Sequence, residues 1–420
     1  MRGIQVCGPT PAYFFTDHIG YVPQRSRFSM PKCLTLAPMA FYPPMMGDSK
    51  RVHRIARALL RHGVDGLCVG KDFLYRGDDD VKRSPKPIRV PSRREVGVRA
   101  FLKRAHYNEV KHPTAEWLEF ARPYLEDPSF DVVYCQFLFT YPTIAPFVKG
   151  RPLFVDTNNS EWGWYDRFAE STSSPLVKAV CGFSKRRADE MLASLPSDAI
   201  MVHVSQADLE DYQSRRPELM HLVVPNGADT MPRENVPDYV APGKKNLLFF
   251  GSLGGKMSQD SLDYFARDFW PTLKDDAHMI VAGSHPTESI MALCQQNGWE
   301  LRKDLTEEQV TQVYDETHYA ILPFTYGAGS KLKMMDACGR GVPVLSTKAG
   351  AVGQDWLPNF VTIDESPQAW LAKIRSSEGA GADWRGQVDE FGRRYGWEGI
   401  TSGLPDLMAD RLRAKVGAAV

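Results

Sequence analysis

Apolar and polar residues alternate along the first half of the chain in a pattern that predicts strands and helices in turn. The apolar run at 33–40 has the length of a buried strand, and 49–63 carries Val52 and Ile55 at helical spacing. A second apolar run follows at 64–71. This order of strand, helix and strand is typical of a doubly wound α/β domain with a parallel sheet.

The same alternation restarts in the second half. Strands are predicted at 246–256 (running into a glycine turn), 277–284, 299–305, 318–324 and 341–347, and helices at 261–273, 285–298, 306–317 and from about 331. No internal repeat of solenoid length occurs. We therefore expect an α/β protein with two Rossmann-like, doubly wound domains that face each other across a cleft.

A chain of 420 residues is too long for one hydrophobic core, so more than one domain is expected. Changes in composition along the chain indicate where the domains begin and end. A stretch rich in proline and polar residues separates the two α/β patterns, and a basic, proline-bearing stretch interrupts the first. The predicted division is 1–33 as an N-terminal extension, 34–235 as the N-terminal domain with an irregular excursion at 72–111, 236–245 as a linker, 246–390 as the C-terminal domain and 391–420 as a C-terminal helix.

Charge and cysteine content exclude several classes of protein. Lys+Arg and Asp+Glu both number 51, so the chain has no net bias toward nucleic acid. The seven cysteines are scattered without a CxxC pair, which favours free thiols over a disulfide framework or a zinc site. No apolar run suits a secretory signal or a membrane span. We expect a cytoplasmic protein.

Small, basic and acidic residues follow one another in the stretch GAGSKLKMMD. Gly327 and Gly329 leave room for a ligand near the backbone, and the helix that follows offers free N–H groups to an anion. Lys331 and Lys333 add positive charge, and Asp336 can accept hydrogen bonds from a sugar hydroxyl. The stretch fits a nucleotide diphosphate with its ribose; the alternative is a plain loop and an amphipathic helix with solvated lysines.

A second glycine turn lies in the same half. Gly251 and Ser252 stand at the end of a predicted strand, and Lys256 comes just beyond. This is a second candidate phosphate contact, with an ordinary surface turn as the alternative.

Around these residues the sequence resembles the retaining glycosyltransferases of the GT-B fold, in particular the family 4 type (glycosyl transferases group 1). The stretches that carry the resemblance are GAGSKLKMMDACGRGVPVLSTKAGAVG, FFGSLGGKMSQDSLDYF, VVPNGAD, HVSQAD, YPPMMGDSKRVHRIARALLRHG and YGWEGITSGLPDLM. The resemblance is good from about 245 to 405, fainter from 34 to 230, and absent for 1–33 and 72–111.

The resemblance implies a role for each part and each matching residue. The N-terminal domain would take the acceptor, the C-terminal domain would bind the nucleotide sugar, and 391–420 would cross back to the first domain. Lys256 and Lys331 would neutralise the departing diphosphate, Asp336 would hold the ribose, and the region 301–304 would contact the base. The full donor-binding set is Gly47, Gly251, Ser252, Lys256, Gly327, Gly329, Ser330, Lys331, Lys333 and Asp336.

The sequence departs from the family pattern at several positions. The first of the family's paired acids is replaced by Ala328, and the second is shortened to Asp336; other members of the sugar-polymer subgroup also lack the first acid. The Gly-Gly loop is Gly47-Asp48 here. Asp48 either contacts substrate hydroxyls, as a third candidate catalytic residue beside the two lysines, or caps the following helix.

A polar stretch, VDTNNSEW, stands where the family often carries a histidine with an acid nearby. It supplies the acceptor-side candidates, with a simple polar turn as the alternative: Asp156, Asn158, Asn159 and Glu161.

No metal and no cofactor are expected. Sugar–phosphate cleavage develops negative charge on the diphosphate, which the lysines and the helix start can stabilise. With retention, as the resemblance implies, the departing phosphate can take the acceptor's proton. The acidic triplet 78–80 resembles the D-x-D of metal-dependent transferases, but it lies in the excursion and not at a strand end.

Residues 81–111 carry ten Lys/Arg against two acids. Three interpretations stay open: a solvated surface loop, a peripheral contact with the anionic inner face of a membrane, and a site for an anionic acceptor.

The predicted function is thus hexosyltransferase-type glycosyl transfer in polysaccharide biosynthesis. A nucleotide sugar, UDP- or GDP-linked, would donate to a glycan, lipid-linked glycan or small-molecule acceptor. The alternatives are a catalytically silent GT-B protein that binds a nucleotide sugar or a partner subunit, and a GT-B epimerase or phosphorylase.

Overall fold

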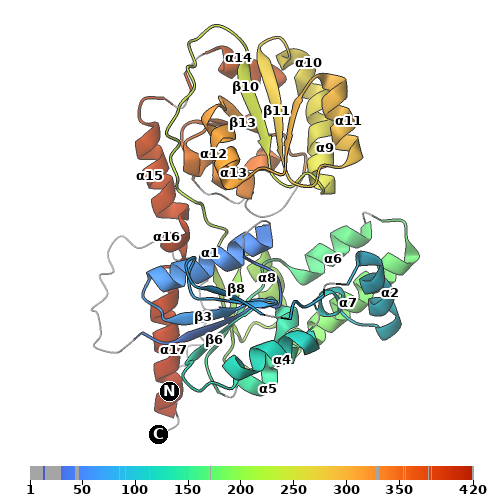
Figure 1. Ribbon diagram of the computed structural model, residues 1–420, viewed down its shortest axis with the longest axis vertical. Coiled ribbons are helices and arrows are strands. Elements are labelled where there is room, and N and C mark those ends of the chain that lie inside the picture. The colour runs from blue at the N-terminus through green and yellow to red at the C-terminus, as the bar shows by residue number, and fades with distance from the viewer. Residues whose placement is uncertain are drawn as a thin grey trace, which may run out of the picture. The chain divides into compact units, whose positions relative to one another are not determined.

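The computed structural model describes residues 13–14, 30–42, 47–84, 86–89, 91–112, 114–148, 150–170, 172–326, 331–352, 354, 356–376, 378–379 and 381–418. The chain forms two compact units, whose helices and strands are drawn in Figure 1. The first unit is Met1–Pro225 with Ile400–Val420, and the second is Asn226–Gly399. Within the described ranges, no helix is long and apolar enough to cross a membrane.

The first unit is built on one sheet, whose described strands lie in the order β1-β9-β8-β7-β6-β2-β3-β4-β5. They are β1 (Tyr13–Phe14), β2 (Cys33–Leu36), β3 (Gly66–Val69), β4 (Phe73–Tyr75), β5 (Val81–Arg83), β6 (Val132–Gln136), β7 (Leu153–Asp156), β8 (Ile200–His203) and β9 (Met220–Val223). Pairing is parallel except at β3–β4 and β4–β5. The strand order reverses beside β2, so the switch point lies between β2 and β6.

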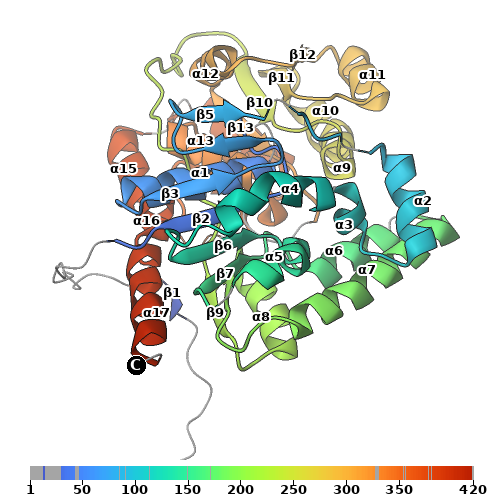
Figure 2. The same ribbon diagram turned by 60° about the horizontal axis from the view of Figure 1, so that its bottom comes forward.

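Helices cover this sheet. They are α1 (Gly47–Arg61), α2 (Arg93–Lys103), α3 (Tyr107–Lys111), α4 (Thr114–Leu125), η1 (Leu138–Thr140), α5 (Tyr141–Val148), α6 (Glu161–Glu170), α7 (Pro175–Ala193), α8 (Gln206–Arg215) and α17 (Leu404–Ala418). The predicted excursion 72–111 is more regular than expected, because it contains β4, β5, α2 and α3. Figure 2 shows α2 beside α6 and α7, at one end of this unit.

The second unit holds a parallel sheet with the order β12-β11-β10-β13-β14-β15. Its strands are β10 (Lys245–Phe250), β11 (Ala277–Gly283), β12 (Glu300–Lys303), β13 (Tyr319–Leu322), β14 (Val344–Ser346) and β15 (Val361–Ile363). Counted from β10, this is the 3-2-1-4-5-6 order of a Rossmann fold, whose ligand crevice lies outside the carboxyl ends of the two strands at the reversal. Those two strands are β10 and β13.

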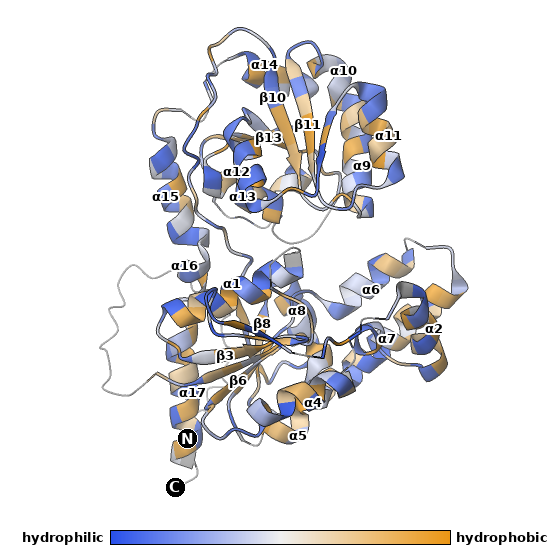
Figure 3. Cartoon of the chain, viewed as in Figure 1, coloured by the Kyte–Doolittle hydropathy of each residue, from blue (hydrophilic) through white to orange (hydrophobic). Residues whose placement is uncertain are grey.

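The helices of the second unit flank that sheet. They are α9 (Lys256–Tyr264), the π-helical turn η2 (Phe265–Phe269), α10 (Trp270–Leu273), α11 (Glu288–Asn297), α12 (Glu307–Asp315), α13 (Leu332–Arg340), η3 (Lys348–Ala351), α14 (Pro367–Arg375) and α15 (Trp384–Tyr395), while α16 (Trp397–Thr401) spans the boundary between the units. Figure 3 shows the hydrophobic β10 and β11 against mixed helices. Strands buried on both faces need continuous apolar runs, which is why the sequence pattern located them.

The boundary between the units differs from the prediction. The structure divides the chain after Pro225, whereas the N-terminal domain was expected to reach 235 and the linker to span 236–245. Arg233 explains the difference, because its buried guanidinium donates to the carbonyl of Thr317 at 2.7 Å and to Tyr239 Oη at 3.0 Å. The stretch after Pro225 is therefore tied to the second unit.

Candidate functional site

A Rossmann fold has its ligand crevice outside the carboxyl ends of the two strands at the switch point, here β10 and β13, and several predicted donor residues lie next to these ends in the chain. Gly251 follows β10 directly, and Lys331 directly precedes α13, the helix that follows β13. Three more predicted residues, Gly327, Gly329 and Ser330, lie outside the described residues. The sheet topology thus places the carboxyl ends of β10 and β13, which precede these two stretches, at the same edge.

Gly251 is held by a close approach to two neighbours. Its φ of +139° is one that L side chains rarely adopt, and an added Cβ would lie 2.8 Å from Lys333 Nζ. Gly283 at the end of β11 is tighter still, since a Cβ there would lie 1.7 Å from the carbonyl oxygen of Gly251. Both positions therefore require glycine. The side chain of Ser252 is exposed, and its carbonyl accepts a hydrogen bond from Ser258 Oγ at 2.6 Å.

Lys333 lies against the turn after β10. Its Nζ is 4.2 Å from the ring centroid of Phe249 and 3.5 Å from Ser258 Oγ. Burial lowers the pKa of Lys333 to about 7, and Asp336 opposes that shift by its negative charge. A lysine in this position changes its charge near neutral pH.

Lys256 is the first residue of α9 and is exposed, with 68% of its side chain accessible. Gly255 precedes the helix and has no side chain to cap the backbone N–H groups of its first turn. The Lys256 ammonium donates to both carboxylate oxygens of Asp260 at 2.9 Å. Lys256 is therefore held by an acid on its own helix.

Tyr326 joins this cluster, and sequence analysis missed it. Its hydroxyl donates to Asp260 Oδ2 at 2.6 Å, across 66 positions of sequence. The hydrogen bond from Tyr326, together with Lys256, lowers the pKa of the Asp260 carboxyl. Burial, with Asp260 beside it, raises the pKa of Tyr326 to about 12. Tyr326 thus links the chain just before 327–330 to the start of α9.

Lys331 and Asp336 belong to the start of α13, the helix that follows β13. Lys331 occupies the N-cap position of α13 and is only 8% exposed. Asp336 is half-buried on α13, where its charge adds to the burial that raises the pKa of Tyr314. A buried cation at a helix start and an acid one turn along remain compatible with phosphate and ribose contacts.

We expect Tyr326→Phe to weaken the binding of a nucleotide diphosphate, the predicted ligand of this stretch, about fivefold. The lost hydrogen bond of about 1 kcal/mol loosens the hold of Tyr326 on α9. Calorimetric titration with UDP and GDP would measure this. Tyr264→Phe, at the far end of α9, is the control, and an equal effect in both variants would contradict the role of Tyr326.

The catalytic candidate Asp48 and the acceptor-side candidates are found in the first unit. Asp48 is exposed in the first turn of α1. Because α1 already begins at Gly47, Asp48 does not occupy the predicted capping position. An acid in a first helical turn still interacts favourably with the helix dipole. The catalytic role of Asp48 stays a prediction.

Asp156 is engaged in a buried ion pair. Arg51 donates to Oδ1 through Nε and to Oδ2 through Nη2, both at 3.1 Å. Tyr134 Oη adds a third hydrogen bond to Oδ2 at 3.0 Å. The Asp156 side chain is fully buried, so these contacts occupy a carboxylate that was expected to face the acceptor.

The three neighbouring candidates differ in exposure. Asn158 is buried with φ +58°, and its amide donates to Gln136 Oε1 at 3.1 Å. Glu161 is buried against His106, with 3.2 Å between the carboxylate and Nε2. Of the four predicted residues, Asn159 alone has an exposed side chain. It is the one best placed to meet a ligand.

The acidic triplet is also engaged. Asp78 accepts a hydrogen bond from Tyr75 Oη at 3.0 Å. Its carboxylate also lies 3.0 Å from His53 Nε2 and 3.3 Å from Arg57 Nε. Across the part of the chain that the structure describes, no group of three or more His, Cys, Asp or Glu residues could hold a metal ion. Metal independence stays a prediction.

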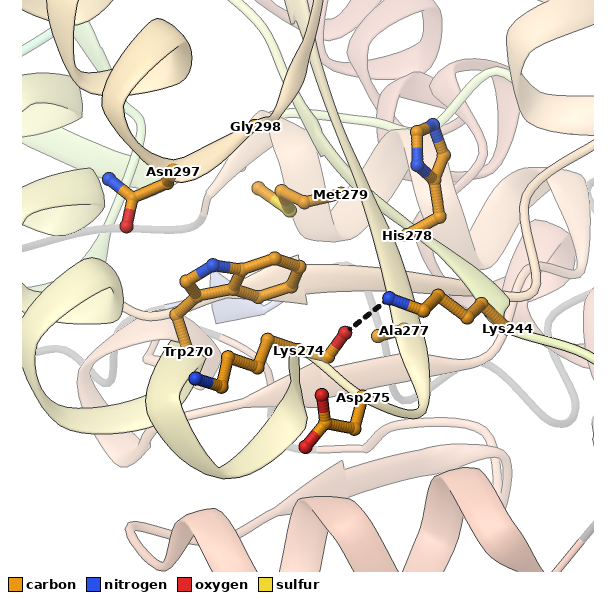
Figure 4. Close-up of a pocket in the computed structure, with 9 residues that line it drawn as sticks. All are labelled: Lys244, Trp270, Lys274, Asp275, Ala277, His278, Met279, Asn297 and Gly298. Carbon is orange, nitrogen blue, oxygen red and sulfur yellow. Dashed lines mark hydrogen bonds between the residues drawn. The ribbon is translucent and has the colours of Figure 1, made fainter.

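A surface hollow lies elsewhere in the second unit (Figure 4). Its lining comes from the segments before β10 and β11, the first residues of β11, α10 and the end of α11: Lys244, Trp270, Lys274, Asp275, Ala277, His278, Met279, Asn297 and Gly298. Lys244 Nζ crosses it to the carbonyl of Lys274 at 2.7 Å. Because it lies at the amino ends of the strands, it is distinct from the crevice beside Gly251.

Comparison with known protein families gives a match within the second unit. Residues 244–377 match the family model described as glycosyl transferases group 1. That range includes Gly251, Lys256, Lys331, Lys333 and Asp336. None of the curated proteins compared with the chain matches it.

Solved structures resemble the chain over nearly its whole length. Sucrose-phosphate synthase from Thermosynechococcus elongatus aligns at 13% identity and a TM-score of 0.65, covering 92% of this chain and 100% of the other. The catalytic domain of Arabidopsis thaliana starch synthase IV, bound to ADP and acarbose, aligns at 13% identity and a TM-score of 0.59, covering 92% of this chain and 100% of the other. Anabaena HepE in complex with UDP-glucose aligns at 14% identity and a TM-score of 0.54, covering 91% of this chain and 99% of the other. These likenesses confirm the expected α/β fold with two Rossmann-like domains.

Proposed function

We propose that the protein is a glycosyltransferase that moves a sugar from a nucleotide-sugar donor to a glycan, lipid-linked glycan or small-molecule acceptor. The observation that carries the proposal is the match of residues 244–377 to group 1 glycosyltransferases. The predicted donor residues Gly251, Lys331, Lys333 and Asp336 belong to that segment, and Lys333 lies close to Gly251 beside the end of β10 at the switch point. The structural neighbours with UDP-glucose and with ADP support a nucleotide-sugar donor.

The chemistry follows from the charges in the crevice. Departure of the diphosphate develops negative charge, which Lys331, Lys333 and the N–H groups at the start of α9 stabilise. Asp260 holds Lys256 before the donor arrives, and the diphosphate competes with that carboxylate for the ammonium. Retention of configuration and family 4 character complete the proposal, with the departing phosphate accepting the acceptor's proton.

The first test is thermal stabilisation by UDP-, GDP-, TDP- and ADP-sugars in the presence of EDTA. A ligand that binds the folded state raises the melting temperature by mass action. We expect one nucleotide class to stabilise the wild type and Lys274→Ala, a control at the amino ends of the strands, but not Lys331→Ala. A shift that survives in Lys331→Ala would contradict the assigned phosphate site.

Transfer itself is tested by mass spectrometry of the acceptor and by release of free sugar. Binding without transfer or hydrolysis would favour the catalytically silent alternative, which the alanine at position 328 keeps in view. NMR of the anomeric proton of the product would test retention.

Lys333 makes donor binding sensitive to pH. Its pKa of about 7 means that it is cationic below that pH and neutral above it. A bound diphosphate favours the cation, so we expect UDP affinity to fall about tenfold as pH rises from 6 to 8.5, and binding at pH 8 to take up a proton.

Calorimetry in buffers of different ionisation enthalpy measures both effects. Lys333→Ala should abolish the proton uptake, while Lys256→Ala should keep it. A wild type without proton uptake at pH 8 would refute a titrating Lys333.

A further inference from the structure

Helix α2 presents apolar side chains on two opposite faces. Its inner face is buried in the first unit, with Val96 at 1% and Ala100 at 0% exposure. Its outer face carries Val98 at 44%, Phe101 at 39% and Leu102 at 73%. The inner face supplies the core contacts of the helix. Val98, Phe101 and Leu102, here called the α2 face, are therefore exposed apolar residues outside the core.

The helix that carries this face is firmly held. A capping box joins Ser92 and Glu95 at its start, and the Arg104 N–H closes its end on the carbonyls of Ala100 and Phe101. The ring of Phe101 lies 6.1 Å from that of Phe183 on α7, and Figures 1 and 2 both show α2 next to α7. The α2 face is thus presented on a fixed support.

Positive charge surrounds the α2 face. Exposed cations on and next to the helix are Arg94, Arg99, Lys103 and Arg104. The one acid of the helix, Glu95, serves the capping box and accepts a hydrogen bond from Arg89 at 3.1 Å. In a chain with equal numbers of acids and bases, residues 81–111 hold ten Lys/Arg against two acids.

We propose that the α2 face docks on the surface of an anionic lipid bilayer. Val98, Phe101 and Leu102 enter the boundary between headgroups and acyl chains, and the cations contact lipid phosphates. A second copy of this chain fits less well, because a symmetric contact would oppose like charges around the same residues. The proposal concerns binding alone and does not depend on sugar transfer.

Co-sedimentation of the full chain with vesicles tests the proposal. We expect the chain to bind, at low salt, to vesicles of phosphatidylcholine that contain about 30 mol% phosphatidylglycerol, and to bind little to pure phosphatidylcholine. Added salt should weaken the binding to the anionic vesicles. Leu102→Glu and Val98→Glu should each weaken binding at least about tenfold. Val240→Glu is the matched control, because Val240 is 79% exposed in the second unit.

Three results would overturn the proposal. One is the absence of binding to anionic vesicles at low salt. Another is equal binding by Leu102→Glu and Val240→Glu. The third is a dimer, detected by light scattering, that Leu102→Glu dissociates, since the face would then belong to a second copy. The melting temperature of each variant shows whether it folds, so lost binding is separated from lost structure.

Discussion

Arg51→Met is expected to lower the free energy of unfolding of the first unit by about 3–5 kcal/mol. The substitution removes both hydrogen bonds from Arg51 to Asp156 and leaves a carboxylate in a fully buried position without its counter-charge. Tyr134 Oη and the Asn158 N–H also donate to Asp156, but these neutral donors do not replace a bidentate guanidinium. Urea unfolding followed by tryptophan fluorescence would measure the loss.

Two variants make this expectation specific. Arg57 lies on the same face of α1 as His53, is partly exposed, and pairs with Asp78. Arg57→Met should lower the free energy of unfolding by less than about 1 kcal/mol. Asp156→Asn in the Arg51→Met background should recover part of the loss, because a neutral amide is less costly to bury. Equal losses for Arg51→Met and Arg57→Met would show that the buried pair is not a major source of stability.

Gly283→Ala is the second substitution with a large expected effect. The new Cβ would lie 1.7 Å from the Gly251 carbonyl oxygen, and φ at Gly283 is +153°. Overpacking and backbone strain together should cost about 2–6 kcal/mol. Because Gly251 must move, we also expect nucleotide binding to be lost even where the protein still folds.

Gly243→Ala separates the two causes. Gly243 also has a positive φ, +120°, but a Cβ there would meet nothing within 4 Å. It should therefore show strain without overpacking and should keep nucleotide binding. Thermal unfolding with and without nucleotide measures both variants, and a Gly283→Ala protein as stable as Gly243→Ala would contradict the close packing of β10 and β11.

The donor-side residues were predicted from local sequence, and their role in binding a donor stays a prediction. They cluster in two short stretches after apolar strands, where the sequence alone supplies a turn, cations and an acid. Tyr326 and Asp260 escaped notice because their hydrogen bond spans 66 positions, and a single tyrosine before a glycine loop has no special pattern.

The acceptor side was harder to predict. The polar stretch after β7 was expected to face a ligand, but Asp156 pairs with Arg51 over 105 positions, and Glu161 pairs with His106 over 55. A sequence shows that a carboxylate follows a strand, but it does not show whether a distant cation reaches it first.

Local sequence located the buried parallel strands and the two α/β patterns, because strands buried on both faces need apolar runs, but it did not reveal β4 and β5 in the excursion. The strand order, which brings the ends of β10 and β13 together, came from the tertiary structure. The tertiary structure also decided the boundary at Pro225, through the contacts of Arg233, and which polar side chains stay exposed. These features depend on pairings between residues far apart in the chain, and such pairings leave no periodic trace in the sequence.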